Sequence, residues 1–286
     1  MNDFWSKQVQ STELLYYSRE ERFNDENKDF WFDRLKVKNG MKILEIGCGG
    51  GHFTNMIKRY FPDCEVYGID LDENHINFAR EKCRELKLDV KYSVADVRSL
   101  PFESETFDLV FSHTVVEHVP FDDFIREQWR VLKTGGDLVI TRVDMVRKND
   151  KPFTVLEDEI NDIYASLKLE PQATVAKYLE DPDMTMRRLH KYKFRDIDFK
   201  YDRVIYYMPD IEKDRTIALK QIERNYRCKL YYALFSLQRA TNQKEMRNTL
   251  LSTLKRQYEE RVRMYLSDEK IFDFQSTLLI TISATK

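Results

Sequence analysis

The chain has 286 residues, of which 42% are hydrophobic and 34% are charged, and its formal net charge is −2. A chain of this length can bury a full core and hold one large domain or a domain with a cap, while its near-neutral charge gives the whole chain no electrostatic attraction for DNA. No apolar run approaches the roughly 18 residues of a membrane span, and no basic segment followed by an apolar one opens the sequence, so we expect a cytoplasmic protein without integral membrane association.

The cysteines and glycines indicate which kinds of site and which secondary structure to expect. Cys48, Cys64, Cys83 and Cys228 form no Cys-x-x-Cys pair, which argues against a zinc site or a disulfide framework, so we expect no metal. All eight glycines lie between positions 40 and 136, and the glycine-free remainder therefore indicates helices with few strands.

The N-terminal region, residues 1–40, is expected to be helical, and it leads into the most informative segment of the chain. An apolar strand ends in Ile43-Leu44-Glu45-Ile46, turns through Gly47-Cys48-Gly49-Gly50-Gly51, and enters a helix over 53–60. Glycine permits a left-handed turn there, and the unpaired N–H groups at a helix start can meet polar or anionic ligand groups. A dinucleotide fingerprint would need glycine where His52 stands, and a Walker-type phosphate loop is also missing.

Three further strands are expected to follow this turn. A second strand, 65–69, is followed by Asp70, at the position from which an acid on a doubly wound sheet reaches ribose hydroxyls. The alternative for Asp70 is a helix N-cap, although Asp72 is the better cap candidate. A third strand, 90–94, precedes Asp96, and a fourth, 107–112, precedes His113.

The second half of the chain is expected to complete the sheet around a helical insertion. We predict a fifth strand over 137–143, a helix over 152–169, a sixth strand from the stretches 192–199 and 203–207, and a seventh over 273–283. Residues 210–270 read as two or three long helices that hold fourteen Lys and Arg against nine Asp and Glu.

Tyrosines are frequent in and beside this insertion. Tyr206 and Tyr207 lie nearest the strand ends, so they are the candidates for a substrate cavity. The alternative is a solvated helix pair whose tyrosines pack toward the core.

Five segments together resemble the class I S-adenosylmethionine-dependent methyltransferases, especially the small-molecule group that includes the ubiquinone and menaquinone enzymes. The segments are LEIGCGGG, GIDLDENHINFAR, VADVRSLPFESETFDLVFS, VVEHV and VLKTGGDLVI, in family order between residues 41 and 143. The resemblance implies a doubly wound, Rossmann-like α/β fold with a seven-stranded sheet, an antiparallel seventh strand and helices on both faces. It also implies S-adenosylmethionine as cofactor, S-adenosylhomocysteine as product, and three parts: an arm over the cofactor site (1–40), the core (41–209 and 271–286) and a helical cap or substrate lid (210–270).

The resemblance assigns the methionine end of the cofactor to the glycine turn and its neighbours. Gly47 and Gly49 would approach it through backbone atoms, with Cys48 between them as a small, adaptable residue. Glu45 would support the turn and reach the amino group, and the Ser112 carbonyl would take the ammonium.

For the adenosine end, the resemblance implies that Asp70 binds both ribose hydroxyls while Leu71 packs on the adenine face. Asp96 would accept from the adenine amino group, and the Val97 N–H would donate to a ring nitrogen. In related enzymes a tyrosine or arginine of the arm meets the methionine carboxylate.

Tyr17 and Arg22 are the candidates for that role here. The alternative is that the aromatic residues of the arm only dock a helix on the sheet.

A sulfonium methyl group is already electrophilic, so the protein mainly has to align a nucleophile behind it and exclude water. A general base is needed only for a protonated acceptor, and His113, at the end of the fourth strand, is the candidate; otherwise it lines the substrate pocket.

No Pro-Pro-aromatic motif of the base-methylating enzymes and no paired-glutamate loop of the arginine methyltransferases is present. The expected function is methyl transfer to a small molecule; the alternatives are an RNA or protein methyltransferase and a non-catalytic S-adenosylmethionine-binding protein.

Overall fold

A computed structural model describes residues 3–148, 155–169, 177–178 and 180–286. Its centre is a seven-stranded sheet in the order β3-β2-β1-β4-β5-β7-β6, in which β1 to β5 run parallel and β7 pairs antiparallel with both β5 and β6. This confirms the expected doubly wound α/β class with an antiparallel seventh strand. The strands are β1 (Lys42–Ile46), β2 (Glu65–Asp70), β3 (Val90–Val94), β4 (Phe107–His113), β5 (Leu132–Lys148), β6 (Arg195–Tyr207) and β7 (Gln275–Thr285).

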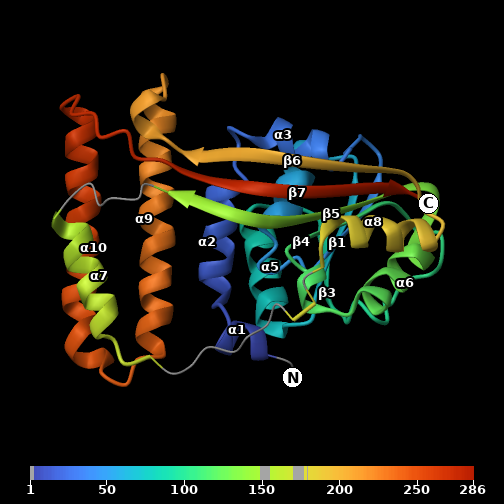
Figure 1. Ribbon diagram of the computed structural model, residues 1–286, viewed down its shortest axis with the longest axis horizontal. Helices are drawn as coiled ribbons and strands as arrows, with labels where there is room; N and C mark the ends of the chain where they lie inside the picture. The colour runs from blue at the N-terminus through green and yellow to red at the C-terminus, as the bar shows by residue number, and fades with distance from the viewer. Residues whose placement is uncertain (1–2, 149–154, 170–176, 179) are drawn as a thin grey trace.

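Helices cover both faces of the sheet and build a separate layer at one end of it (Figure 1). The helices are α1 (Phe4–Gln8), α2 (Thr12–Arg22), α3 (Lys28–Arg34), α4 (His52–Tyr60), α5 (Glu73–Glu85), α6 (Phe121–Val131), α7 (Val155–Ser166), α8 (Pro182–Lys191), α9 (Arg215–Gln238) and α10 (Gln243–Leu266), with short 3-10 turns η1 (Val116–His118) and η2 (Pro209–Ile211). Among the residues described, none of these helices is both long and apolar enough to cross a bilayer.

The core consists of two apolar layers, one on each face of the sheet. On one face Trp31 of α3 and Phe53 of α4 pack against strand residues such as Phe111. On the other face Phe124 of α6 and Leu189 of α8 pack with the remaining apolar strand side chains. All five side chains are at most 3% exposed, so the core strands are buried on both sides, as expected of the parallel part of such a sheet.

Two strands differ from the sequence prediction. The fifth strand is expected over 137–143 but runs from Leu132 to Lys148, and the sixth is continuous from Arg195 to Tyr207. The reason is β7, which pairs with both neighbours along most of their length and continues their ladders beyond the core. Polar residues such as Asp198 and Lys200 are thus held in a strand by pairing that local periodicity does not reveal.

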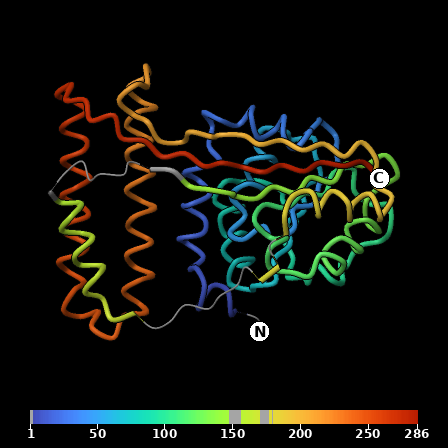
Figure 2. Tube along the Cα trace, in the orientation of Figure 1, coloured from blue at the N-terminus to red at the C-terminus, as the bar shows by residue number. Residues whose placement is uncertain are grey.

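The helices α7, α9 and α10 form a layer of their own beyond the ends of β5, β6 and β7 (Figures 1 and 2). Their contact surface is a small apolar core that includes Ile160, Leu237 and Leu254. The insertion between β6 and β7 contains α9 and α10. The helix α2 stands between α9 and the helices α4 and α5, while α9 also packs directly on β6. The helix expected over 152–169 is α7; positions 152–154 lie outside the described residues.

Candidate active site

A cavity of about 650 Å³ lies where β1, β2, β3 and β4 end, and residues of helices α1 and α2 form part of its wall. In doubly wound sheets the carboxyl ends of the parallel strands form the edge at which ligands bind. Each strand contributes the segment that follows its last residues: Ile46–Gly49 after β1, Asp70–Asp72 after β2, Ala95–Arg98 after β3 and His113–Val115 after β4.

The glycine turn is shaped by two close approaches. Gly47 and Gly49 have φ of 67° and 54°, in the left-handed region that side chains rarely adopt. A Cβ on Gly47 would lie 2.5 Å from a methyl carbon of Val115, and one on Gly49 would lie 2.6 Å from Leu15 of α2. Val115 and Leu15 leave no room for a side chain at Gly47 or Gly49. The turn therefore presents only backbone atoms to the cavity.

Asp70 is held with its carboxylate toward this turn. Its Oδ2 accepts the Gly49 N–H at 2.9 Å, and its Oδ1 accepts the Asp72 N–H at 2.9 Å. Asp72 is the N-cap of α5, accepting the Asn74 N–H at 2.9 Å, so the cap role falls to Asp72 as the sequence indicates. Asp70 is thus a fixed pair of acceptors on the cavity wall, with lone pairs left for a diol.

The wall beyond β3 carries Asp96, Val97 and Arg98, and Leu71 faces the same cavity with 45% of its surface exposed. The Arg98 guanidinium donates hydrogen bonds to the Asp96 carboxylate from Nε at 3.0 Å and from Nη2 at 2.6 Å. These hydrogen bonds lower the pKa of Asp96. Asp96 is therefore ionised at neutral pH and oriented, as an acceptor for an amino group should be.

Glu45 is the most strongly perturbed carboxyl group of this wall. It is buried beneath the glycine turn, where the Thr54 hydroxyl donates to its Oε2 at 2.5 Å. Burial raises its pKa to about 8, although Thr54 and the charge of Arg19 both act in the opposite direction. Without a ligand, the protein therefore keeps a mostly protonated acid at this position at pH 7.

We expect Glu45→Gln to stabilise the ligand-free protein by about 1–3 kcal/mol at pH 8. Between the pKa of the unfolded chain and about 8, the native carboxyl holds a proton that the unfolded one has released, so stability is lost as the pH rises through this window. Urea unfolding at pH 6 and pH 8 measures the effect, with the exposed Glu13→Gln as matched control. A variant with the same pH dependence as the parent protein would contradict the assignment.

His113 ends β4 with one ring nitrogen hydrogen-bonded and the other buried without a hydrogen-bond partner among the described residues. Its Nδ1 lies 2.7 Å from the Thr141 hydroxyl, which itself donates to the Ser112 carbonyl at 3.2 Å. Since that hydroxyl gives its proton to Ser112, it accepts from Nδ1–H, and the lone pair is left on Nε2. Nε2 is buried and has no hydrogen-bond partner among the described residues.

The His113 imidazole is neutral at pH 7. Burial, followed by the positive charges of Arg19 and Arg22, lowers its pKa well below the usual 6.5. His113 lines the cavity, while Phe23 and Trp31 pack edge-to-face on its ring with centroids 4.8 and 6.1 Å away. A neutral imidazole with an unpaired Nε2 can accept a proton or a hydrogen bond from a molecule that reaches it.

Arg19 was not among the residues singled out from the sequence, yet it lies on the cavity wall beside Arg22. Its guanidinium donates to the Thr114 hydroxyl at 2.7 Å, and that hydroxyl donates to the His113 carbonyl at 2.7 Å. Thr114 has φ of 55°, an unfavourable conformation for a β-branched residue that this chain of hydrogen bonds holds in place. The available signal was the three-residue spacing from Arg22, which places both side chains on one face of α2.

The structure does not bring Tyr17, Tyr206 or Tyr207 to the cavity. Tyr17 stacks on Tyr231 of α9, with ring centroids 4.5 Å apart. Tyr206 and Tyr207 are buried against α9 and α10, where the Tyr207 hydroxyl donates to Asp273 at 2.8 Å. Their rings are used in packing, because the end of β6 meets the helical layer and not the edge that carries the glycine turn.

Ser112 and the helical insertion also lie behind the wall. The Ser112 side chain is fully buried, and its carbonyl accepts the Thr141 hydroxyl. No described residue of α9 or α10 lines the cavity, because α2 stands between them. The direct cover of this site is thus the N-terminal arm, with Trp5 of α1 and Leu15, Arg19 and Arg22 of α2.

Comparisons with known proteins agree with this geometry. Residues 44–140 match a family model described as a methyltransferase domain. The chain is 32% identical over 173 residues to the ubiquinone/menaquinone biosynthesis C-methyltransferase UbiE of Bordetella parapertussis, covering 54% of this chain and 67% of that protein. The chain therefore belongs to the class I S-adenosylmethionine-dependent methyltransferase family.

Other relatives share only part of their length with this chain. Phosphoethanolamine N-methyltransferase 3 of Arabidopsis thaliana is 37% identical over 111 residues, 38% of this chain, and the match spans only about a fifth (22%) of the plant protein. A structure of Haemonchus contortus phosphoethanolamine N-methyltransferase 2 with phosphomonomethylethanolamine and S-adenosylhomocysteine superposes with a TM-score of 0.57 at 22% identity, covering 99% of this chain and 59% of that one. This second likeness concerns the fold.

Proposed function

We propose that this protein transfers the methyl group of S-adenosylmethionine directly, in line, to a small-molecule acceptor. The observation that carries the proposal is a single cavity that joins the bare glycine turn and the oriented carboxylates of Asp70 and Asp96 to His113 at the end of β4. The cofactor supplies an electrophilic methyl group, so the protein's task is binding, alignment and exclusion of water.

The residues present fit the cofactor in chemical type. The turn at Gly47 and Gly49 is closed to any side chain by Val115 and Leu15, which leaves backbone for the methionine portion to approach. Asp70 offers acceptors for two vicinal hydroxyls, and Asp96 offers one for an amino group.

Beside these two carboxylates, Leu71 and Val97 supply apolar surface and a backbone N–H for the adenine, and Arg22 of the arm supplies a cation for the methionine carboxylate. Glu45, Cys48 and the Ser112 backbone support the turn from behind.

His113 is the group that could take a proton from the acceptor. Its Nε2 keeps a lone pair because Thr141 fixes the proton on Nδ1. The low pKa makes it a weak base, suited to accepting a proton late in the transfer, when the acceptor has become acidic. In this proposal Thr141 is a positioning residue.

The same proposal divides the chain into an arm over the cofactor (1–40), a core (41–209 and 271–286) and a helical insertion (210–270) that holds the arm. It includes a cytoplasmic location and no DNA partner. The support is that all four cysteines are free and that the net charge is −2.

Incubation with methyl-labelled S-adenosylmethionine and a cell extract, separated into small molecules, RNA and protein, tests the function. We expect label in the small-molecule fraction and none above background with Asp70→Ala. Label in RNA or protein would support the macromolecular alternative, and cofactor binding without transfer would support a binding protein. Thermal shift with NAD, which should not stabilise the chain, checks the cofactor class.

A further inference from the structure

We propose that the methyl acceptor carries an oxyanion, a carboxylate or a phosphate, held by one of the two arginines that α2 presents to the cavity. The inference rests on the proposed function, because it assigns one of these arginines to the cofactor. Arg19 and Arg22 both line the cavity, three residues apart on the same helix.

Neither guanidinium is neutralised by the protein. No carboxylate of the described residues lies within 4 Å of either one; Arg19 donates to the Thr114 hydroxyl and Arg22 to the Ser18 carbonyl at 3.3 Å. Both side chains are half-buried and line the cavity, and burial lowers the pKa of Arg19. A desolvated guanidinium without a counter-ion is unfavourable, so this pair is suited to anions that enter with ligands.

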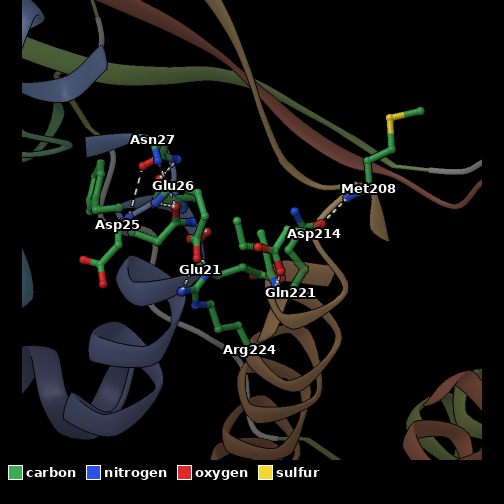
Figure 3. A network of polar contacts seen from close by, with 12 residues as sticks. Glu21, Asp25, Glu26, Asn27, Met208, Asp214, Gln221 and Arg224 are labelled. Carbon is green, nitrogen blue, oxygen red and sulfur yellow. Dashed lines mark hydrogen bonds and ion pairs between the residues drawn. The ribbon is translucent and has the colours of Figure 1, made fainter. Parts of the chain in front are cut away.

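Two of the three acids of α2, Glu20 and Glu21, are directed away from the cavity and toward α9, and the third, Glu13, is exposed. Glu20 pairs with Arg227 at 2.8 Å, and Glu21 accepts from Asn225 at 2.9 Å. Figure 3 shows Glu21 on this side of α2, facing the helix that carries Arg224. The helix thus separates its charges, with acids on the α9 side and two arginines on the cavity side.

The groups that face the arginines from other elements do not offset their charge. Glu45 holds its proton at neutral pH because burial raises its pKa to about 8, and His113 is neutral. Glu117 of η1 is the remaining acid that acts on Arg19, and it lies beyond ion-pair distance. The neighbouring carboxylates are therefore Glu117, beyond ion-pair distance, and Asp70, whose two oxygens already accept the Gly49 and Asp72 N–H groups; neither pairs with an arginine.

The single carboxylate of the cofactor can neutralise the charge of only one of the two arginines. S-adenosylmethionine carries one carboxylate together with an ammonium and a sulfonium, so it adds net positive charge to the cavity that Arg19 and Arg22 line. The second guanidinium and the sulfonium both favour an acceptor with its own negative charge. Arg19 is anchored at Thr114, directly beside His113, where an acceptor would have to lie.

The test uses the complex with S-adenosylhomocysteine and measures binding of sodium phosphate and sodium acetate by calorimetry, against chloride at equal ionic strength. We expect at least one of these anions to bind the parent complex. Of Arg19→Met and Arg22→Met, one should keep the affinity for S-adenosylhomocysteine and weaken the anion at least tenfold. The other should weaken S-adenosylhomocysteine but not 5′-methylthioadenosine, which lacks the amino-acid portion.

Arg126→Met is the matched control, because Arg126 is exposed on α6 and pairs only with Asp123. If a methionine variant does not fold, the lysine variant at the same position, Arg19→Lys or Arg22→Lys, is used in its place, because lysine keeps the positive charge. The inference is overturned if no anion binds beyond the chloride reference, or if both variants weaken only S-adenosylhomocysteine, since both arginines would then hold the cofactor carboxylate. Failure of S-adenosylhomocysteine to bind the parent protein would instead overturn the proposed function.

Discussion

Replacing Asp70 by alanine is expected to weaken the binding of S-adenosylhomocysteine by about 100-fold or more. The carboxylate would hold two ribose hydroxyls, and hydrogen bonds to a charged group are worth about 1.5–3 kcal/mol each. It also accepts the N–H groups of Gly49 and Asp72, so its loss removes one hydrogen bond from the glycine turn and one from the segment that leads into α5. Calorimetric titration of the variant and the parent protein measures the change.

The control for this experiment is Asp63→Ala, which removes an exposed aspartate that precedes β2 and lies away from the cavity. Asp70→Asn separates the two contributions, because the amide keeps one acceptor oxygen but not the charge; we expect it to bind less well than the parent protein and better than the alanine variant. Unchanged affinity in Asp70→Ala would contradict the assignment of Asp70 to the ribose hydroxyls, which is the main support for the cofactor site.

Arg261→Met is expected to lower the free energy of unfolding by about 3–5 kcal/mol. Arg261 of α10 is 3% exposed at its side chain, and its Nη2 lies 2.8 Å from the carboxylates of both Asp210 and Asp273. Asp210 also accepts the Phe272 N–H at 2.9 Å, and Asp273 accepts the Tyr207 hydroxyl. Removing the arginine leaves two buried carboxylates facing each other without a cation, at the point where the helical layer joins β6 and β7.

Urea unfolding of Arg261→Met should be compared with Arg263→Met, the same substitution two residues further along α10. Arg263 is 64% exposed, and its ion-pair distances are 3.9 Å, so its loss is expected to cost about 0.5 kcal/mol or less. Equal destabilisation in the two variants would show that the buried cluster contributes no more than a surface pair.

The cluster explains why the tyrosines of β6 are not available to a substrate. Tyr207 belongs to the Arg261 cluster, and Tyr206 packs beside it against Ile222 of α9. From the sequence, a pair of tyrosines at a strand end looks like a cavity wall. The direction in which they face depends on where α9 and α10 dock, and that docking is set by contacts distant in the sequence.

The features that the sequence determined by itself depend on residues that are close together in the chain. The glycine turn, the strand ends with their acids and the Asp72 cap are encoded by neighbouring residues, because φ preferences, capping and strand periodicity act over a few positions. The seven-stranded sheet and the antiparallel direction of its seventh strand followed from the resemblance to a known family, and the structure agrees.

Tertiary structure alone decided which side chains of the arm reach the cavity. Tyr17, Arg19 and Arg22 lie within six residues on one helix, yet Tyr17 stacks on α9 while both arginines face the strand ends. The same holds for His113, whose Nε2 keeps its lone pair because Thr141, 28 positions away on β5, binds Nδ1. A side chain's partner across a helix or sheet is fixed by packing between distant segments, and no local pattern records it.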